Sequence, residues 1–352
     1  MSNKISFDNR IYFIYNNDIN LLHRYKRKEE VTMSYPLLMQ APVKDYIWGG
    51  TKLREKYNKV SAADKLAESW ELSCHQDGPS IIANGEAQGK TLTQYIQEQG
   101  RGILGSKAQA FENFPIMIKL IDAKDNLSVQ VHPDNEYALK NEGEYGKTEM
   151  WYVIEAEPGA ELLYGVEKKL TPRELADSLQ NGTITDICHH APVKKGDVFF
   201  IPAGTIHAIG KGILLAEVQQ NSNTTYRLYD YGRLGNDGKP RQLHVRQGSE
   251  VCSLEPLPLK EEKEIVTLSP DCRGELLAAC DYFTTYGVKV DGTVSLAAGS
   301  ESFQTFTVLE GSLTLTAGET VLEMPAGQTV FLPAGMGDYQ LSGKAGLIFT
   351  TL

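Results

Sequence analysis

One histidine and three upstream residues give this sequence its clearest chemical pattern. An apolar run ends in a Pro-Ala-Gly turn, residues 202–204, and the turn leads into His207. Upstream, Gln130 and His132 stand two residues apart, and Glu149 follows them. Successive side chains of a strand point to opposite faces, so Gln130 and His132 would lie on the same face. Two imidazoles, a carboxylate and a carboxamide could then converge on one metal ion.

The donor atoms restrict which metal would bind. Imidazole nitrogens with carboxylate and amide oxygens suit zinc, and they also accommodate iron, manganese or cobalt. Sulfur is not needed, and the five cysteines are an odd number without a CxxC pair, which is typical of reduced thiols. A single His, Gln or Glu is more often structural than a ligand. Because four such residues form one joint pattern, we predict one metal ion per chain.

Strands and tight turns are the elements that must position these residues. The segment 171–174 reads Thr-Pro-Arg-Glu, which combines an N-cap, a proline at the first helical position and an acid three residues after the cap. It predicts a small helical insertion, residues 168–190, between Glu149 and His207. Residues 91–99 and 135–142 are also compatible with helices. Apolar runs predict strands at residues 115–121, 127–132, 150–154, 197–201, 213–220 and 225–231.

A repeated turn motif indicates two related β-barrels. The pattern Gly-x5-Pro-Ala-Gly at residues 196–204 returns at residues 327–335. In the second copy Asp338 takes the position of His207, and the sequence from residue 298 to residue 352 contains no histidine. The second barrel should therefore hold no metal.

Charge and composition restrict the class of protein. The net charge of −10 argues against general nucleic-acid binding. No run of about 18 apolar residues could span a bilayer, and no signal-peptide pattern is present. We expect a soluble cytoplasmic protein without a membrane partner, and a monomer or a weak homo-oligomer.

The N-terminal residues form a polar segment unlike the rest of the chain. Residues 27–30 read Arg-Lys-Glu-Glu, which purine-rich codons resembling a bacterial ribosome-binding sequence can encode just before Met33. We therefore expect residues 1–33 to be a non-native or disordered extension, the alternative being a genuine tail. The predicted domains are residues 34–265, which would be catalytic, and residues 266–352, which would be free of metal.

Longer motifs carry a resemblance to a known family. The turn motif with its histidine resembles the metal motif of the cupins, whose fold is a jelly-roll barrel. More specific segments are Phe-Pro-Ile-Met-Ile-Lys-Leu-Ile at 114–121, Leu-Ser-Val-Gln-Val-His-Pro-Asp at 127–134 and Gly-Lys-Thr-Glu-Met-Trp-Tyr at 146–152. With residues 217–231 they resemble the type I mannose-6-phosphate isomerases in their short bacterial form. The resemblance covers about residues 36–352 and implies a mainly β protein of two cupin-like jelly-roll barrels with a small helical insertion.

The resemblance also implies an activity and a set of site residues. The family is a zinc-dependent aldose-ketose isomerase that interconverts mannose 6-phosphate and fructose 6-phosphate, so the partner would be a phosphorylated hexose. The zinc ligands would be Gln130, His132, Glu149 and His207. The catalytic arginine falls on Arg227, ten residues after Glu217, and the active-site lysine falls on Lys147. Lys119 and Ser128 match pocket positions for the phosphate or nearby sugar oxygens.

Two departures from longer relatives bear on proton transfer. Asn223 and Gly146 stand where those relatives carry an aspartate and an imidazole, so neither can carry a proton here. The isomerisation removes a proton next to a carbonyl and passes through an enediol. Acid-base work would then rest on Lys147, Glu217 or a zinc-bound water. Arg227 suits an enediolate oxygen or a phosphate better, because its guanidinium does not release protons.

Two other functions fit part of the pattern. A different cupin enzyme, such as a metal-dependent dioxygenase, would prefer iron and consume oxygen, whereas a non-catalytic sugar-binding module would bind without turnover. His189 and His190 are adjacent, so their side chains diverge, and we expect them in a polar loop rather than at a metal. Arg227 could alternatively form a structural ion pair with Glu217.

Overall fold

The computed structural model describes residues 4–7, 10–13, 34–235, 237–258 and 264–352. The chain divides into two compact units, Met1–Ser34 and Tyr35–Leu352. In the first unit an antiparallel hairpin is described, formed by β1 (Lys4–Phe7) and β2 (Arg10–Phe13). The remainder of the predicted N-terminal extension, with Met33, lies outside the described residues.

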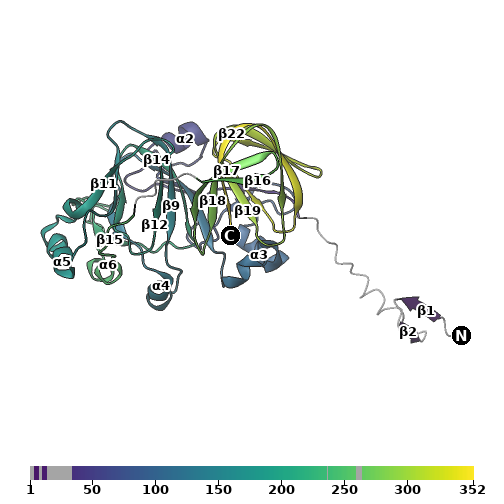
Figure 1. Ribbon diagram of the computed structural model, residues 1–352, viewed down its shortest axis with the longest axis horizontal. Coiled ribbons are helices and arrows are strands. Elements are labelled where there is room, and N and C mark those ends of the chain that lie inside the picture. Colours follow the sequence, from purple (N-terminus) through teal and green to yellow (C-terminus); the bar gives the residue numbers. More distant parts are fainter. Residues whose placement is uncertain (1–3, 8–9, 14–33, 236, 259–263) are drawn as a thin grey trace. The chain divides into compact units, whose positions relative to one another are not determined.

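The larger unit is mainly β and contains two cupin-like barrels with few helices (Figure 1). A six-stranded and a five-stranded sheet build the first barrel, and a nine-stranded sheet builds the second. The six-stranded sheet contains β4 (Val43–Lys44), β5 (Glu68–Leu72), β7 (Ile116–Ala123), β9 (Glu149–Ala156), β12 (Val198–Ile201) and β14 (Ile213–Gln220). The five-stranded sheet contains β8 (Val129–Val131), β10 (Glu161–Val166), β11 (Cys188–Pro192), β13 (His207–Ile209) and β15 (Tyr226–Tyr229).

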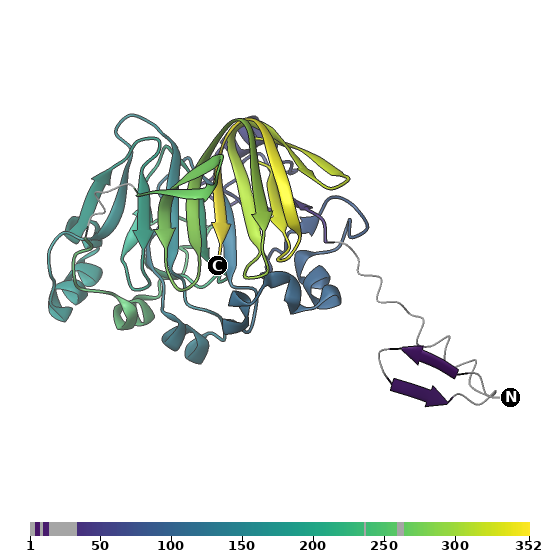
Figure 2. The same cartoon turned by 45° about the vertical axis from the view of Figure 1, so that its right-hand side comes forward.

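The second barrel is assembled from both ends of this unit. Its sheet contains β3 (Leu37–Gln40), β6 (Ile81–Ile82), β16 (Glu264–Ser269), β17 (Cys272–Ala279), β18 (Thr284–Ala298), β19 (Gln304–Ala317), β20 (Thr320–Pro325), β21 (Thr329–Leu332) and β22 (Gly337–Thr351). Strand β3 pairs with β21, so early residues close a barrel made otherwise of late ones. Figure 2 shows the long strands β18, β19 and β22, coloured green to yellow, beside the teal strands of the first barrel. The domain division at residue 265 stays a prediction.

Strand β14 shows how burial positions polar side chains. All eight of its residues are buried. Leu214, Ala216 and Val218 pack into the hydrophobic core that lies between the two barrels, whereas Ile213 and Leu215 pack between the two sheets of the first barrel. Because side chains alternate, Glu217 points to the same interior as Ile213 and Leu215. A carboxylate is thereby placed inside the first barrel.

The described α-helices are short, and the start of the helix at Pro172 follows the predicted cap chemistry. They are α2 (Lys52–Tyr57), α3 (Leu92–Gln99), α4 (Asn135–Asn141), α5 (Pro172–Asn181) and α6 (Val245–Val251). Thr171 and Glu174 form the predicted capping box of α5, and Pro172 is its first residue. Among the described residues, no helix combines the length and apolar character needed to cross a bilayer.

One local prediction was wrong. We expected a polar loop at His189 and His190, but both lie in β11, which pairs with β10. Strand β11 is an edge strand of its sheet. Its sequence, Cys-His-His-Ala-Pro, does not alternate between apolar and polar residues, so no strand could be recognised from the sequence. The other predicted strands and helices are confirmed, although β8 and β15 are each three residues shorter than predicted.

Candidate active site

Strands from both sheets of the first barrel bring the predicted ligands together in its interior. His207 in β13 faces Gln130 in β8, and Glu149 opens β9. His132 follows β8 by one residue. The candidate ligand atoms of His132, Glu149 and His207 lie within 4.8 Å of one another, and all three residues are buried. The terminal amide of Gln130 is 3.3 Å from His207 Nε2.

Backbone carbonyls fix the orientation of both imidazoles. His132 Nδ1 donates to the Thr224 carbonyl at 2.9 Å, and His207 Nδ1 donates to the Thr205 carbonyl at 2.9 Å. Each bond leaves the Nε2 lone pair facing Glu149, whose oxygens lie 3.7 Å from His132 Nε2 and 3.3 Å from His207 Nε2. Burial lowers the pKa of both imidazoles, to about 4 for His207, so both are neutral near pH 7.

The cluster has the character of a metal site. His132 Nε2 and both carboxylate oxygens of Glu149 are buried and have no hydrogen-bond partner. Leaving such groups without a partner costs about 1–3 kcal/mol each, and more for a charged group. A cation bound between them would provide the missing interactions. The residues present therefore fit a bound metal ion, with Gln130 able to turn its amide oxygen toward it.

Two lysines and two more carboxylates lie next to this cluster. Lys147 Nζ is 3.6 Å from Glu149, and Lys119 Nζ is 3.1 Å from Glu217 and 3.8 Å from Glu68. Burial and then the charge of Lys119 lower the pKa of Lys147. Burial alone would raise the pKa of Glu217, but Lys119 and Lys147 together lower it. A lysine with a lowered pKa and a carboxylate with a lowered pKa thus share one buried site.

These groups open into a cavity of about 280 Å³. The predicted site residues that line it are Lys119, Ser128, Gln130, Lys147, Glu217 and Arg227. Trp48 also lines the cavity, whereas Trp151 donates to Glu217 at 2.8 Å. His189 and His190 lie elsewhere, each bonded to its own glutamate, Glu167 and Glu161.

Arg227 sits beside the candidate metal ligands. It faces Gln130 across the β15 and β8 pairing, and residues directly opposite each other in such a pair point to the same face. Its Nη1 donates to the Gln242 carbonyl at 2.9 Å, and its Nε is buried without a partner. Glu217, the alternative ion-pair partner of Arg227, is instead paired with Lys119.

Several contributing residues were missed by the sequence reasoning. Glu144 accepts a hydrogen bond from the Asn223 backbone at 3.2 Å and contacts His75 Nε2 at 3.1 Å. It thereby anchors the loop whose Thr224 carbonyl orients His132. Arg241 lines the cavity as well. No local motif marks these positions, because their roles arise from contacts between distant parts of the chain.

Comparison with known proteins gives consistent matches along nearly the whole larger unit. Residues 37–158 match the family model of the phosphomannose isomerase type I catalytic domain, and residues 274–352 match that of the mannose-6-phosphate isomerase cupin domain. Mannose-6-phosphate isomerase ManA of Bacillus subtilis is 37% identical over 318 residues, which cover 90% of this chain and 99% of that protein. The mannose-6-phosphate isomerase of Streptococcus mutans is 36% identical, with coverage of 90% and 98%.

Solved structures agree with this pattern. The crystal structure of the mannose 6-phosphate isomerase from Bacillus subtilis matches with a TM-score of 0.83 at 34% identity, covering 90% of this chain and 99% of that one. A variant of the phosphomannose isomerase from Salmonella typhimurium matches with a TM-score of 0.71 at 19% identity, covering 90% and 98%. At that lower identity the match supports the fold alone.

Proposed function

This chain belongs to the type I phosphomannose isomerases and is a mannose-6-phosphate isomerase, and we propose that it acts through an enediol with the help of one bound zinc ion. The reaction would interconvert D-mannose 6-phosphate and D-fructose 6-phosphate. The zinc ligands would be Gln130, His132, Glu149 and His207.

The metal proposal rests on a group of buried atoms that have no hydrogen-bond partner. His132 Nε2 and the two Glu149 oxygens face one another without hydrogen-bond partners, and carbonyls hold both imidazoles in the tautomer that presents Nε2. Nitrogen and oxygen donors without sulfur suit zinc. When bound, zinc supplies a Lewis acid that stabilises negative charge on the substrate oxygens O1 and O2.

Proton transfer falls to residues of the same cavity. Going from the aldose to the ketose, a base removes the proton from C2 to give the enediol, and the proton returns to C1. Lys147 supports this role because burial lowers its pKa, and Glu217 competes for it as a carboxylate that Lys119 keeps ionised. Asn223 lines the cavity but its amide cannot carry the proton.

Charge stabilisation and substrate orientation fall to the remaining cationic and polar groups. Arg227 remains protonated and points to the same face as Gln130, so its guanidinium can donate to an oxygen on which charge develops. Lys119 and Ser128 line the cavity and would contact sugar oxygens or the phosphate. We expect the enzyme to work in the cytoplasm as a monomer or a weak homo-oligomer.

A coupled assay for fructose 6-phosphate formed from mannose 6-phosphate tests this proposal. The protein would be assayed as isolated, after removal of metal with a chelator, and after addition of zinc. We expect activity to disappear with the metal and to return with zinc. Turnover that survives complete metal removal would overturn the role of zinc, and oxygen uptake by the iron-loaded protein would favour the dioxygenase alternative.

A further inference from the structure

A carboxylate just after β15 holds two arginines, of which Arg241 lines the cavity. Asp230 Oδ1 accepts from Arg241 Nη2 at 2.6 Å, and Asp230 Oδ2 accepts from Arg241 Nε at 2.7 Å. The same carboxylate accepts from Arg233 Nη2 at 2.6 Å. Asp230 is buried, and such a two-point contact fixes both the position and the plane of a guanidinium. Arg241 is therefore a rigid part of the cavity wall.

Arg227 lies next to this pair. Its Nη1 donates to the carbonyl of Gln242, the residue after Arg241, and both arginines line the cavity. Burial, and then the positive charge of Arg241, lower the pKa of Arg227, so the two guanidiniums sense each other. Asp230 is the counter-ion of Arg241 and Arg233, whereas among the described residues no carboxylate forms an ion pair with Arg227.

The charges of the cavity are distributed unevenly. At the arginine end, Asp230 bonds the guanidiniums of Arg233 and Arg241, and Arg227 lies close enough to sense their charges, so three cations and one carboxylate leave an excess of two positive charges. At the other end the two lysines are outnumbered by carboxylates, namely Lys119 and Lys147 against Glu68, Glu149 and Glu217. A phosphate monoester carries a charge of about −1.5 to −2 at pH 7. The arginine end offers an excess of positive charge that its own side chains supply, without the bound metal ion.

Free donors are available at the same end. Asp230 engages Nε and Nη2 of Arg241, and among the described contacts its Nη1 has no protein acceptor. Arg227 Nε is buried without a partner. Lys119 differs from both, because Glu217 and Glu68 already surround its ammonium group.

We infer that Arg241, braced by Asp230, binds the phosphate group of the substrate, and that Arg227 keeps its role at the reacting oxygens. The inference rests on the proposed function. The sequence left open whether Lys119 and Ser128 contact the phosphate or the nearby sugar oxygens, and the inference assigns the phosphate to Arg241. The phosphate lies at the arginine end, and Lys119 and Ser128 contact sugar oxygens nearer the metal ligands. Arg233 supports Asp230 from the side and also bonds the Asn126 carbonyl.

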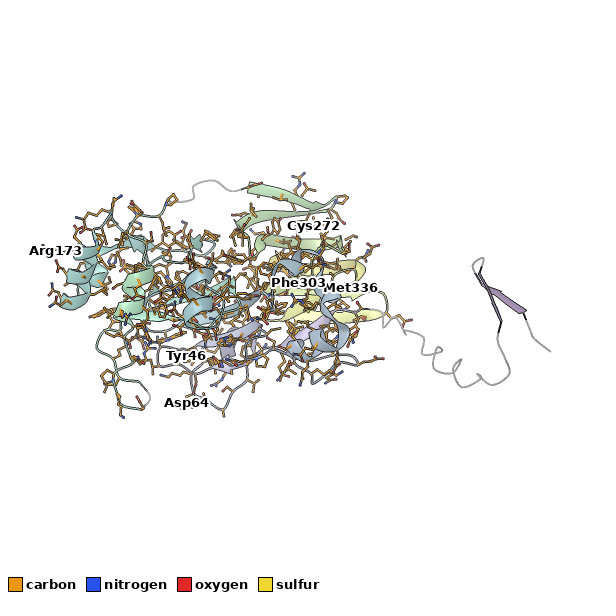
Figure 3. All side chains as sticks on the ribbon, turned by 90° about the horizontal axis from the view of Figure 1, so that it is seen from below. Tyr46, Asp64, Arg173, Cys272, Phe303 and Met336 are labelled. Atoms are coloured by element: carbon orange, nitrogen blue, oxygen red, sulfur yellow. The ribbon has the colours of Figure 1, made fainter. Side chains whose placement is uncertain are left out.

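The test compares Arg241→Ala with Arg173→Ala. Arg173 lies on α5, its side chain is almost fully exposed, and Figure 3 shows it at the margin of the first barrel. We expect Arg241→Ala to raise the KM for mannose 6-phosphate about 10- to 100-fold with a smaller change in kcat, because it removes a charge-assisted hydrogen bond made before and during the reaction. The inhibition constant of inorganic phosphate should rise to a similar extent. Arg173→Ala should change neither.

Further variants keep the result interpretable if Arg241→Ala folds poorly. Arg241→Lys retains the charge but loses the two-point contact with Asp230, so it should show part of the effect. Asp230→Asn should also weaken inhibition by inorganic phosphate while bound metal stays near that of the wild type. An unchanged KM and an unchanged phosphate inhibition constant in Arg241→Ala, with an active wild type, would overturn the inference alone.

Calorimetry with inorganic phosphate separates this inference from the proposed function. If the wild type shows no isomerase activity with any divalent metal, the proposed function fails. Phosphate binding that is present in the wild type and lost in Arg241→Ala would still support the anion subsite. Equal phosphate binding by the two proteins would reject it.

Discussion

In both barrels a strand ends in a Pro-Ala-Gly turn, and the two turns have nearly the same backbone. Gly196 and Gly327 have φ values of 88° and 86°, and Gly204 and Gly335 have 88° and 76°. The Gly204 amide donates to the His132 carbonyl at 2.8 Å, and the Gly335 amide donates to the Gly299 carbonyl at 2.8 Å. The second turn is therefore a structural copy of the first.

The residues that take the positions of the candidate metal ligands in the second barrel are different. Ile201 faces Glu149 in the first barrel, and Leu332 faces Gln304 in the second, so Gln304 takes the place of the carboxylate. By the same matching Gly299 replaces His132, and Asp338 replaces His207. The Gln304 amide donates to the Ala297 carbonyl at 2.9 Å and accepts from the Tyr339 hydroxyl at 2.8 Å.

The functional and the structural copy of this turn differ in whether their buried polar atoms have partners. Both copies retain the turn, so the turn alone does not indicate chemistry. In the first barrel the buried Glu149 oxygens lack partners, whereas in the second barrel the matching amide is satisfied by protein groups. Polar atoms left without partners, together with two imidazoles, mark the first copy as the candidate metal site.

The residues that follow the two turns, His207 and Asp338, should respond very differently to substitution, and the His207 variant should lose the most activity. His207→Ala should lose bound metal and reduce kcat/KM at least about 1000-fold, since Lewis-acid stabilisation contributes several kcal/mol. Asp338→Ala, its counterpart, should keep both. Metal content and the coupled isomerase assay provide the measurements. Loss of metal from the Asp338 variant would show that the second barrel contributes to binding.

A smaller effect should separate charge stabilisation from metal binding. Arg227→Ala should lower kcat about 100- to 1000-fold, the usual cost of removing one donor to a developing oxyanion, while one equivalent of metal remains. Arg273→Ala, on the exposed surface of β17 in the second barrel, is the matched control. An active Arg227 variant would reject the role proposed for this residue.

The two turn glycines should differ in how well they tolerate alanine. Both have positive φ, which costs an alanine about 1–2 kcal/mol. At Gly204 a Cβ would also meet the Val251 carbonyl oxygen at 2.9 Å, whereas at Gly335 it would meet nothing within 4 Å. Thermal unfolding should therefore show a larger loss of Tm for Gly204→Ala than for Gly335→Ala. Equal losses of Tm would mean that the backbone near Val251 moves away from the added Cβ at little energetic cost.

The smallest predicted signal is the release of protons on metal binding. Burial and the nearby Glu217 raise the pKa of Glu149 to about 8, so this carboxyl is mostly protonated near pH 7 in the metal-free protein. The imidazoles have lowered pKa values and are already neutral. Binding should release about one proton at pH 7. Calorimetry in buffers of different ionisation enthalpy measures this number, and release of two or more would mean that a second group such as Lys147 also loses a proton.

Much of the fold and the candidate ligand set could be predicted from local sequence. Strand alternation placed Gln130 and His132 on one face, and cap chemistry located α5. The Thr224 carbonyl that orients His132 could not be predicted, because a backbone carbonyl has no sequence signature. Nor could Arg241, whose place depends on a contact with Asp230 across an intervening loop.

The pairing of β3 with β21 sets a limit on how the protein can fold during synthesis. Met39 faces Thr329, so this strand leaves the ribosome long before its partner exists. At 5–20 residues per second the wait is on the order of 15–60 s. Strand β6 can pair with one edge of β3 early, but the edge that β21 later covers stays open throughout that time and can pair with other chains. Completion of the second barrel is thus a late, non-local event, and chaperones that shield the emerging N-terminal strands should increase the yield of native enzyme more than they affect its final stability.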